Sequence, residues 1–161
     1  MHCFVTGAAG FIGSSLTDRL LALGHDVTGF DNFSTGRRQF LEDALRSSAF
    51  RLLEGDLLDR DAVRKAMVGA DCVFHLAATA DVRYGVHHPR RDLEQNTTAT
   101  CNVLEAMRLN NVGRISPTRV LHERPELRPE GSETTLEPTG TPDSNRRPVL
   151  QSKLGRSGLR L

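Results

Sequence analysis

Residues 5–13 read Val-Thr-Gly-Ala-Ala-Gly-Phe-Ile-Gly, and three of these nine residues are glycines spaced three apart. An apolar, strand-like segment over 1–6 precedes it, and apolar residues at helical spacing follow over 11–23. Glycines in such a turn allow a sharp exit from the strand, a close backbone approach to a pyrophosphate and close packing of helix on strand. The free N–H groups at the start of the helix favour phosphate. The stretch therefore predicts a dinucleotide-binding turn that uses Gly7, Gly10 and Gly13.

An acidic residue, Asp31, stands about 20 positions after the glycines, at the end of a second predicted strand over 26–30. A carboxylate at this place accepts hydrogen bonds from the adenosine ribose hydroxyls, whereas it would repel the 2′-phosphate of NADP. The spacing therefore favours NAD as the cofactor. The alternative is that Asp31 is an ordinary loop carboxylate.

Strands and helices alternate through residues 1–113. Strands are predicted over 1–6, 26–30, 50–53 and 72–76, and helices over 11–23, 38–47, 58–67 and 89–109. This alternation indicates right-handed βαβ units on a parallel sheet, and the apolar strands indicate a sheet that is covered on both faces. The predicted fold class is α/β, with an incomplete Rossmann-like, doubly wound NAD-binding domain over 1–113.

The remaining residues, 114–161, differ in composition. Six of the seven prolines lie here, and 130–145 consists mainly of Glu, Ser, Thr, Gly and Pro. Such a composition is typical of irregular or disordered chain. Pro117 would also remove a backbone N–H from a central strand. We predict an irregular Pro-rich tail, and we hypothesise that a disrupted reading frame produced the residues from about 115 to 150.

Charge and cysteine content exclude several function classes. The 161 residues carry a formal net charge of +1 with scattered arginines, so neither nucleic acid nor an anionic membrane is an expected partner. Apolar runs are too short to cross a bilayer and the amino terminus lacks signal-peptide features, which predicts a cytoplasmic protein. Cys3, Cys72 and Cys101 form no CxxC pair and are predicted to be buried thiols, and no metal site is expected.

Five motifs in order give the chain a family resemblance. They are Thr6-Gly7-x-x-Gly10-Phe11-Ile12-Gly13, Asp31-Asn32-Phe33-Ser34-Thr35-Gly36, Gly55-Asp56-Leu57, His75-Leu76-Ala77-Ala78 and Asn96-x-x-x-Thr100. Over roughly residues 1–112 the chain resembles the extended short-chain dehydrogenases. It looks most like the NAD-dependent sugar-nucleotide epimerases and dehydratases of the UDP-glucose 4-epimerase type.

The resemblance implies a role for each matching residue. Phe11 and Ile12 would lie along the pyrophosphate turn, residues 31–36 would surround the adenosine ribose, and Asp56 and Leu57, after the third strand, would flank adenine. The segment after the fourth strand would follow the nicotinamide ribose. Together with the three glycines, the implied cofactor-binding residues are Phe11, Ile12, Asp31, Asn32, Phe33, Ser34, Thr35, Gly36, Asp56, Leu57, Leu76, Ala77, Ala78, Thr79 and Asn96.

The catalytic pair that the resemblance implies is Tyr-x-x-x-Lys, in which the lysine and the cofactor lower the tyrosine pKa so that the phenolate accepts a proton. The sole tyrosine, Tyr84, is followed four residues later by His88 rather than lysine. Lys153, within Gln-Ser-Lys-Leu, matches the lysine position, and the tyrosine position is then Val149. The alternative is that Lys153 is a tail lysine that matches by chance.

These observations leave three hypotheses about function. The first is the NAD-binding portion of a sugar-nucleotide epimerase or dehydratase, truncated and inactive alone, with a nucleotide-sugar as the family's substrate. The second is an active NAD-dependent enzyme similar to UDP-glucose 4-epimerase. The third is a non-catalytic interaction protein that forms a homodimer through the 89–109 helix, with Leu93, Leu104 and Met107 at the contact. The alternative for this apolar stripe, and its more ordinary role, is packing on the sheet.

Overall fold

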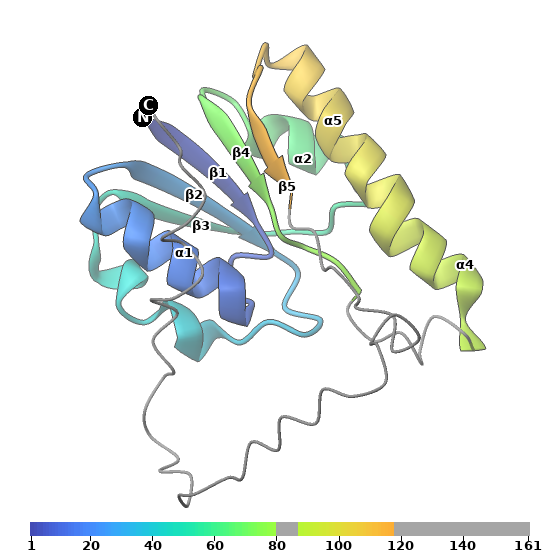
Figure 1. Cartoon of the computed structure of the whole chain (residues 1–161), viewed down its shortest axis with the longest axis horizontal. Coiled ribbons are helices and arrows are strands. Elements are labelled where there is room, and N and C mark those ends of the chain that lie inside the picture. The colour runs from blue at the N-terminus through green and yellow to red at the C-terminus, as the bar shows by residue number, and fades with distance from the viewer. Residues whose placement is uncertain (80–86, 118–161) are drawn as a thin grey trace, which may run out of the picture. The chain divides into compact units, whose positions relative to one another are not determined.

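A computed structural model describes residues 1–79 and 87–117 of the chain, and these form a parallel sheet with helices on both faces. The strands are β1 (His2–Thr6), β2 (Asp26–Asp31), β3 (Phe50–Glu54), β4 (Cys72–His75) and β5 (Ile115–Pro117). Their order is β3-β2-β1-β4-β5 and every pair is parallel (Figure 1). This order reverses direction between β1 and β4, which is the topological switch point of a doubly wound fold. The predicted Rossmann-like sheet is confirmed.

Helical segments connect these strands. They are α1 (Phe11–Ala22), η1 (Arg38–Leu41), η2 (Ala44–Arg46), α2 (Arg60–Ala66), α4 (Pro89–Asp92), η3 (Leu93–Thr98) and α5 (Ala99–Leu109). The helix predicted over 89–109 forms, although its middle segment, η3, is π-helical. In the parts of the chain described here, no helix has the length and apolar character that a membrane crossing requires.

The helix predicted over 38–47 is wrong, because the chain forms the two short 3-10 turns η1 and η2 there. The buried residues of this region are Leu41 and Ala44, which pack against Ala9. Each of the two turns contributes one of these buried residues, Leu41 from η1 and Ala44 from η2, so the segment is attached without a longer amphipathic helix.

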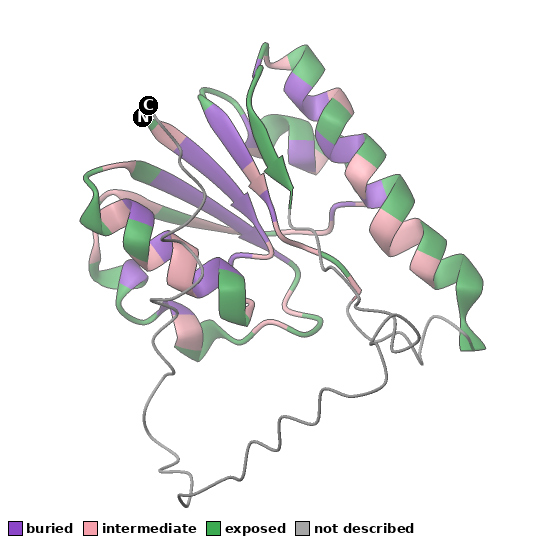
Figure 2. Cartoon of the chain, in the orientation of Figure 1, coloured by how far each residue is buried: buried purple, intermediate pink, exposed green. Residues whose placement is uncertain are grey.

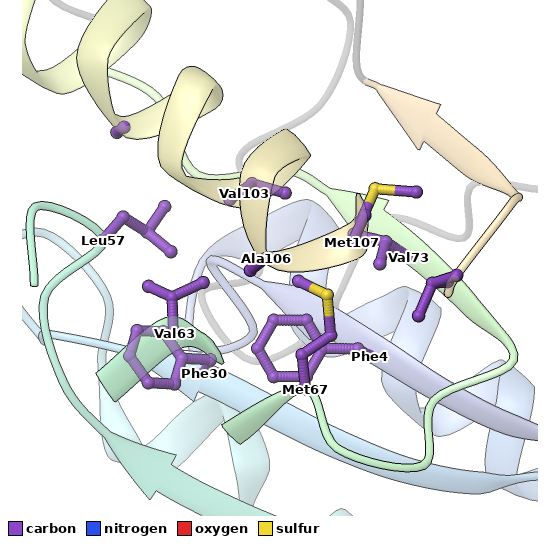
Figure 3. Packing of buried hydrophobic residues seen from close by; sticks show 11 residues of the cluster. Phe4, Phe30, Leu57, Val63, Met67, Val73, Val103, Ala106 and Met107 are labelled. Carbon is purple, nitrogen blue, oxygen red and sulfur yellow. The ribbon is translucent and has the colours of Figure 1, made fainter. Parts of the chain in front are cut away.

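Two apolar layers sandwich the sheet, as the near-continuous apolar strands predict. On one face α2 and α5 pack on the strands, with Phe4, Phe30 and Val73 at the centre of the cluster that Figure 3 shows. On the other face α1 packs on Cys3, Val5 and Val27. The central strands β1 and β4 are consequently mostly buried, as Figure 2 shows.

The thiols of Cys3 and Cys72 lie side by side between two strands. The two residues are register partners of β1 and β4, and their sulfurs are 3.5 Å apart. Burial, with help from the Cys72 thiol, raises the pKa of Cys3 to about 12, so this thiol is unreactive at neutral pH. Cys101 is exposed on α5, and the prediction that all three cysteines are buried is wrong for this residue.

The sheet continues beyond residue 113, where the sequence predicted only irregular chain. Ile115–Pro117 forms β5 and pairs with β4, and all three of its residues are exposed. Backbone hydrogen bonds make this pairing, so it needs no apolar pattern. Pro117 is the last residue of the strand. The rest of the predicted tail, 118–161, lies outside the described residues, so its irregular structure and the frame disruption stay predictions.

Thr17, whose buried hydroxyl lies on the sheet-facing side of α1, gives a test of stability. Its side chain is fully buried, and its hydroxyl has no hydrogen-bond partner within the described part of the chain. Thr17→Val keeps the shape and removes the unsatisfied group, so we expect the free energy of unfolding to rise by about 1 kcal/mol. Urea denaturation of both chains measures this difference. A loss of stability in the variant would show that the hydroxyl is satisfied.

Candidate functional site

The glycine turn lies at the switch point of the sheet. Gly7 has a φ of +69°, and a Cβ there would lie 2.8 Å from the Ala77 nitrogen. The N–H of Gly7 donates to the Phe30 carbonyl (2.9 Å), and the N–H of Gly10 donates to the Gly7 carbonyl (3.0 Å). The turn is thus tied to β2 and touches the backbone that follows β4. Only glycine combines this left-handed conformation with so close a contact.

Gly13 lets α1 begin in direct contact with this turn. A Cβ on Gly13 would overlap the Gly7 carbonyl oxygen and would lie 2.8 Å from the Gly7 carbonyl carbon. A Cβ on Gly10 would meet only the Gly7 oxygen, at 3.2 Å, so the space beside Gly10 is otherwise open. The contacts thus require glycine at positions 7 and 13, whereas the role of Gly10 beside a pyrophosphate stays a prediction.

The start of α1 has the features of an anion-binding helix terminus. The first bond of its ladder runs from the Ser14 N–H to the Gly10 carbonyl (2.9 Å), so the N–H groups of residues 11–13 precede the ladder. In the described structure no side chain caps this end, and its first turn carries no acidic residue. Phe11 and Ile12 are half exposed. These donors and the helix dipole fit a pyrophosphate.

Asp31 is buried at the carboxyl end of β2, beside the glycine turn. One carboxylate oxygen accepts the N–H of Ala9 (2.9 Å) and the other accepts the N–H of Phe33 (2.8 Å). Because an ionised carboxylate has about four acceptor positions, two remain for ribose hydroxyls. The bond to Ala9 joins residues far apart in sequence, and the spacing rule that identified Asp31 gave no sign of it.

The loop after β2 folds back over the turn. The N–H of Arg37 donates to the Ala9 carbonyl (2.9 Å), and a Cβ on Gly36 would lie 3.0 Å from an Asp31 carboxylate oxygen. Phe33 adopts a φ of 56°, while Ser34 and Thr35 are exposed. The segment 32–36 therefore lies beside Asp31, where the family resemblance places the adenosine ribose.

Asn32 and Asp56 join the loops that follow β2 and β3. The Asn32 amide donates to one Asp56 oxygen (3.2 Å), and the Leu58 N–H donates to the other (2.9 Å). The side chain of Leu57 is buried in the core, so a contact with adenine would have to come from its backbone.

Sequence reasoning missed Asn102, whose buried amide donates to the Leu57 carbonyl (2.9 Å). A polar residue on the apolar face of α5 was the available signal.

The segment 76–79 follows β4 and lies against the glycine turn. The Leu76 and Ala77 N–H groups donate to the Thr6 hydroxyl oxygen, at 3.2 and 3.3 Å. The Thr79 N–H donates to the Asn96 side-chain oxygen (2.9 Å). The segment is thereby attached to β1 at its start and to η3 at its end. Ala78 between them is exposed.

The structure thus gathers most of the predicted cofactor residues at the carboxyl ends of β1, β2 and β4, where open α/β sheets bind ligands. Lys153, Tyr84 and Val149 lie outside the described residues, so the catalytic assignment of Lys153 stays a prediction. Met107 is buried in the core, which agrees with packing of the helix on the sheet and removes Met107 from the alternative dimer surface. It faces the sheet because its position on α5 falls among the buried positions of that helix.

His75 gives this site a pH-dependent stability. Burial lowers the pKa of His75 below the ordinary value of 6.5, and the hydroxyls of Thr6 and Thr100 lie at its two ring nitrogens. As the pH falls through 6.5, the unfolded chain therefore takes up this proton before the native chain does. We expect the free energy of unfolding to be maximal above that pH and to fall as the pH drops below it.

Urea denaturation at a series of pH values from 7.5 to 5 measures this effect. His75→Gln removes the titrating group, so its pH dependence should be shallower than that of the parent chain. Equal slopes for the two chains would show that His75 does not contribute.

The strand order, the glycine turn and the acid at the end of β2 define a dinucleotide-binding protein of the Rossmann type. The family model of the NAD dependent epimerase/dehydratase family matches residues 3–142. The chain belongs to this family, whose cofactor is NAD.

Relatives support this assignment. The chain is 42% identical over 119 residues to the UDP-glucose 4-epimerase of Mycolicibacterium smegmatis. The aligned residues are 73% of this chain and 38% of that protein. It is 35% identical over 130 residues to UDP-glucuronic acid decarboxylase 1 of Xenopus tropicalis, over 80% of this chain and 30% of that protein. The chain therefore spans well under half the length of these relatives.

Solved structures agree with the fold. The UDP-glucose 4-epimerase of Thermotoga maritima, solved with UDP-glucose, matches with a TM-score of 0.67 and 31% identity over 73% of this chain and 37% of that one. The UDP-glucose 4-epimerase of Thermus thermophilus, solved in complex with NAD, matches with a TM-score of 0.64 and 35% identity over 71% of this chain and 36% of that one.

Proposed function

We propose that this chain is the NAD-binding portion of a UDP-sugar epimerase or dehydratase and that it is inactive alone. The observation that carries the proposal is the grouping at one sheet edge of three features. They are the uncapped start of α1, the buried carboxylate of Asp31 and the segment 76–79. Each matches one part of a dinucleotide: the pyrophosphate, the adenosine ribose and the nicotinamide ribose.

The residues present fit NAD in a defined orientation. The N–H groups ahead of Ser14 would donate to the pyrophosphate, and Asp31 would accept the ribose hydroxyls. Asp31 would also repel a 2′-phosphate, which favours NAD over NADP. When bound, NAD supplies the hydride acceptor. The chain's own part is then to bind and orient the cofactor.

Two features of the sequence support inactivity of this chain alone. Tyr84 is the sole tyrosine and lacks a lysine four residues later, and the position four before Lys153 is Val149. Valine has no exchangeable proton, so a missing general base would cost proton transfer about 10²–10⁴-fold in rate. The nucleotide-sugar is the substrate we propose for the whole protein, because the relatives described above act on or bind UDP-sugars by name.

Calorimetry with NAD and NADP, followed by a turnover assay with UDP-galactose, tests the proposal. We expect NAD to bind with a dissociation constant below about 1 mM, NADP to bind more weakly, and no epimerisation. The M. smegmatis relative serves as the positive control for turnover. Absence of NAD binding would overturn the cofactor assignment, and epimerisation at the rate of the control would overturn the proposed inactivity.

A homodimer through α4, η3 and α5 is a second candidate. Leu93 and Leu104 are 57% and 47% exposed along these consecutive helical segments, so both side chains are available for contact with a second copy of the chain. A dimer would bury them. Sedimentation velocity of the parent chain and of Leu104→Glu tests this, with a dimer expected only for the parent. A monomeric parent at high concentration would contradict it.

A further inference from the structure

A network of hydrogen bonds connects the start of the segment 76–79 to its end. At its start, the Thr6 hydroxyl lies 2.7 Å from Nδ1 of His75 and accepts the N–H of Ala77, and it shares the N–H of Leu76 with the Thr6 backbone carbonyl. On the other side of the ring, Nε2 of His75 lies 3.0 Å from the Thr100 hydroxyl. The two threonines come from β1 and α5, so the imidazole bridges the sheet and the helix that covers it.

The hydrogen-bond network reaches the backbone carbonyl of Asn96, and the side chain of the same residue bonds the end of the segment. The Thr100 hydroxyl donates to the Asn96 carbonyl (2.6 Å), and the Asn96 side-chain oxygen accepts the Thr79 N–H (2.9 Å). The Asn96 amide also donates to Asp92 (2.7 Å), which sets the orientation of its side chain. Asn96 belongs to the π-helical η3, and such turns are common at functional sites.

The direction of each bond follows from these partners. Because the Thr100 proton goes to a carbonyl, the Thr100 oxygen must accept from His75, which therefore carries its proton on Nε2. Nδ1 is then the acceptor for the Thr6 proton. The Thr6 oxygen is left free to accept the two backbone N–H groups. Only the neutral Nε2–H form of the ring satisfies every member.

We propose that His75 and Thr100 are positioning residues, which fix the backbone of the segment 76–79 for contact with the nicotinamide end of NAD. The inference rests on the proposed function. The other side of the segment is bounded by Gly7, where a Cβ would lie within 3.0 Å of the backbone of Leu76 and Ala77. The segment therefore lies between a rigid turn and a directed chain of hydrogen bonds, and a change in either would displace it.

Two substitutions at one position separate positioning from general stability. Thr100→Val keeps the shape but leaves His75 Nε2–H and the Asn96 carbonyl without the hydroxyl, so we expect NAD affinity to fall about tenfold. Thr100→Ser restores the hydroxyl and should restore affinity to within about twofold of the parent. Thr98→Val, on the exposed side of the same helical segment, is the matched control and should leave the affinity unchanged.

All chains are titrated with NAD by calorimetry at a temperature at which each is folded. In parallel, ¹⁵N NMR of the ligand-free parent reads the His75 tautomer at neutral pH, with the Nε2–H form expected. Equal NAD affinity of Thr100→Val and the parent overturns the inference while the proposed function stands. An Nδ1–H or doubly protonated ring in the parent also overturns it. A parent that binds no NAD overturns the proposed function, and with it this inference.

Discussion

Gly13→Ala should destabilise the chain by about 2–3 kcal/mol and remove NAD binding. In an open helix this substitution would instead stabilise by about 1 kcal/mol, because alanine is the better helix former. Here the new Cβ would overlap the Gly7 carbonyl oxygen, a backbone atom that cannot rotate away. Either α1 moves outward or the Gly7 turn deforms. Both displace the N–H groups that we assign to the pyrophosphate.

Gly113→Ala is the matched control for this prediction. A Cβ at Gly113 meets nothing within 4 Å, so the variant should keep the stability and NAD affinity of the parent. Urea denaturation and calorimetry measure both quantities. If Gly13→Ala were as stable as the control and bound NAD equally well, the contact between α1 and the turn would not be essential.

Asp31→Asn should weaken NAD binding about 100-fold, the effect expected when a charged acceptor of two ribose hydroxyls is lost. The variant should also lose stability, because the carboxylate accepts N–H groups on both oxygens. An amide has one acceptor oxygen and places its NH₂ group against either Ala9 or Phe33. Leaving one buried donor unpaired costs about 1–3 kcal/mol.

Asp26→Asn is the control for charge, since Asp26 lies at the opposite end of β2 and is exposed. The preference for NAD over NADP should narrow in Asp31→Asn and stay unchanged in Asp26→Asn, because only Asp31 would face the 2′-phosphate. An unchanged preference in both variants would contradict the assigned role of Asp31.

Short-range patterns in the sequence predicted the glycine turn, the strands and the position of the acid after the second strand. The parallel sheet, and the expectation of a site at its carboxyl end, follow from these patterns. The Thr6–His75–Thr100 bonds join residues that only the sheet order brings together. No spacing rule in the sequence signals them.

The errors have physical causes as well. The helix over 38–47 was predicted from the spacing of its apolar residues. Two 3-10 turns bury Leu41 and Ala44 without such a helix. Cys101 was predicted buried from its residue type, although its place on α5 leaves it in solvent. For Met107 the sequence left both a dimer contact and packing on the sheet open, because a stripe of apolar residues does not tell which of them faces the sheet.

Titration of the ¹⁵N-labelled chain with NAD, followed by two-dimensional NMR, tests most directly whether the carboxyl ends of β1, β2 and β4 bind NAD. We expect the backbone signals of residues 10–13, 31–36 and 76–79 to shift together with a single dissociation constant. Shifts confined to other residues, or none at millimolar NAD, would contradict it.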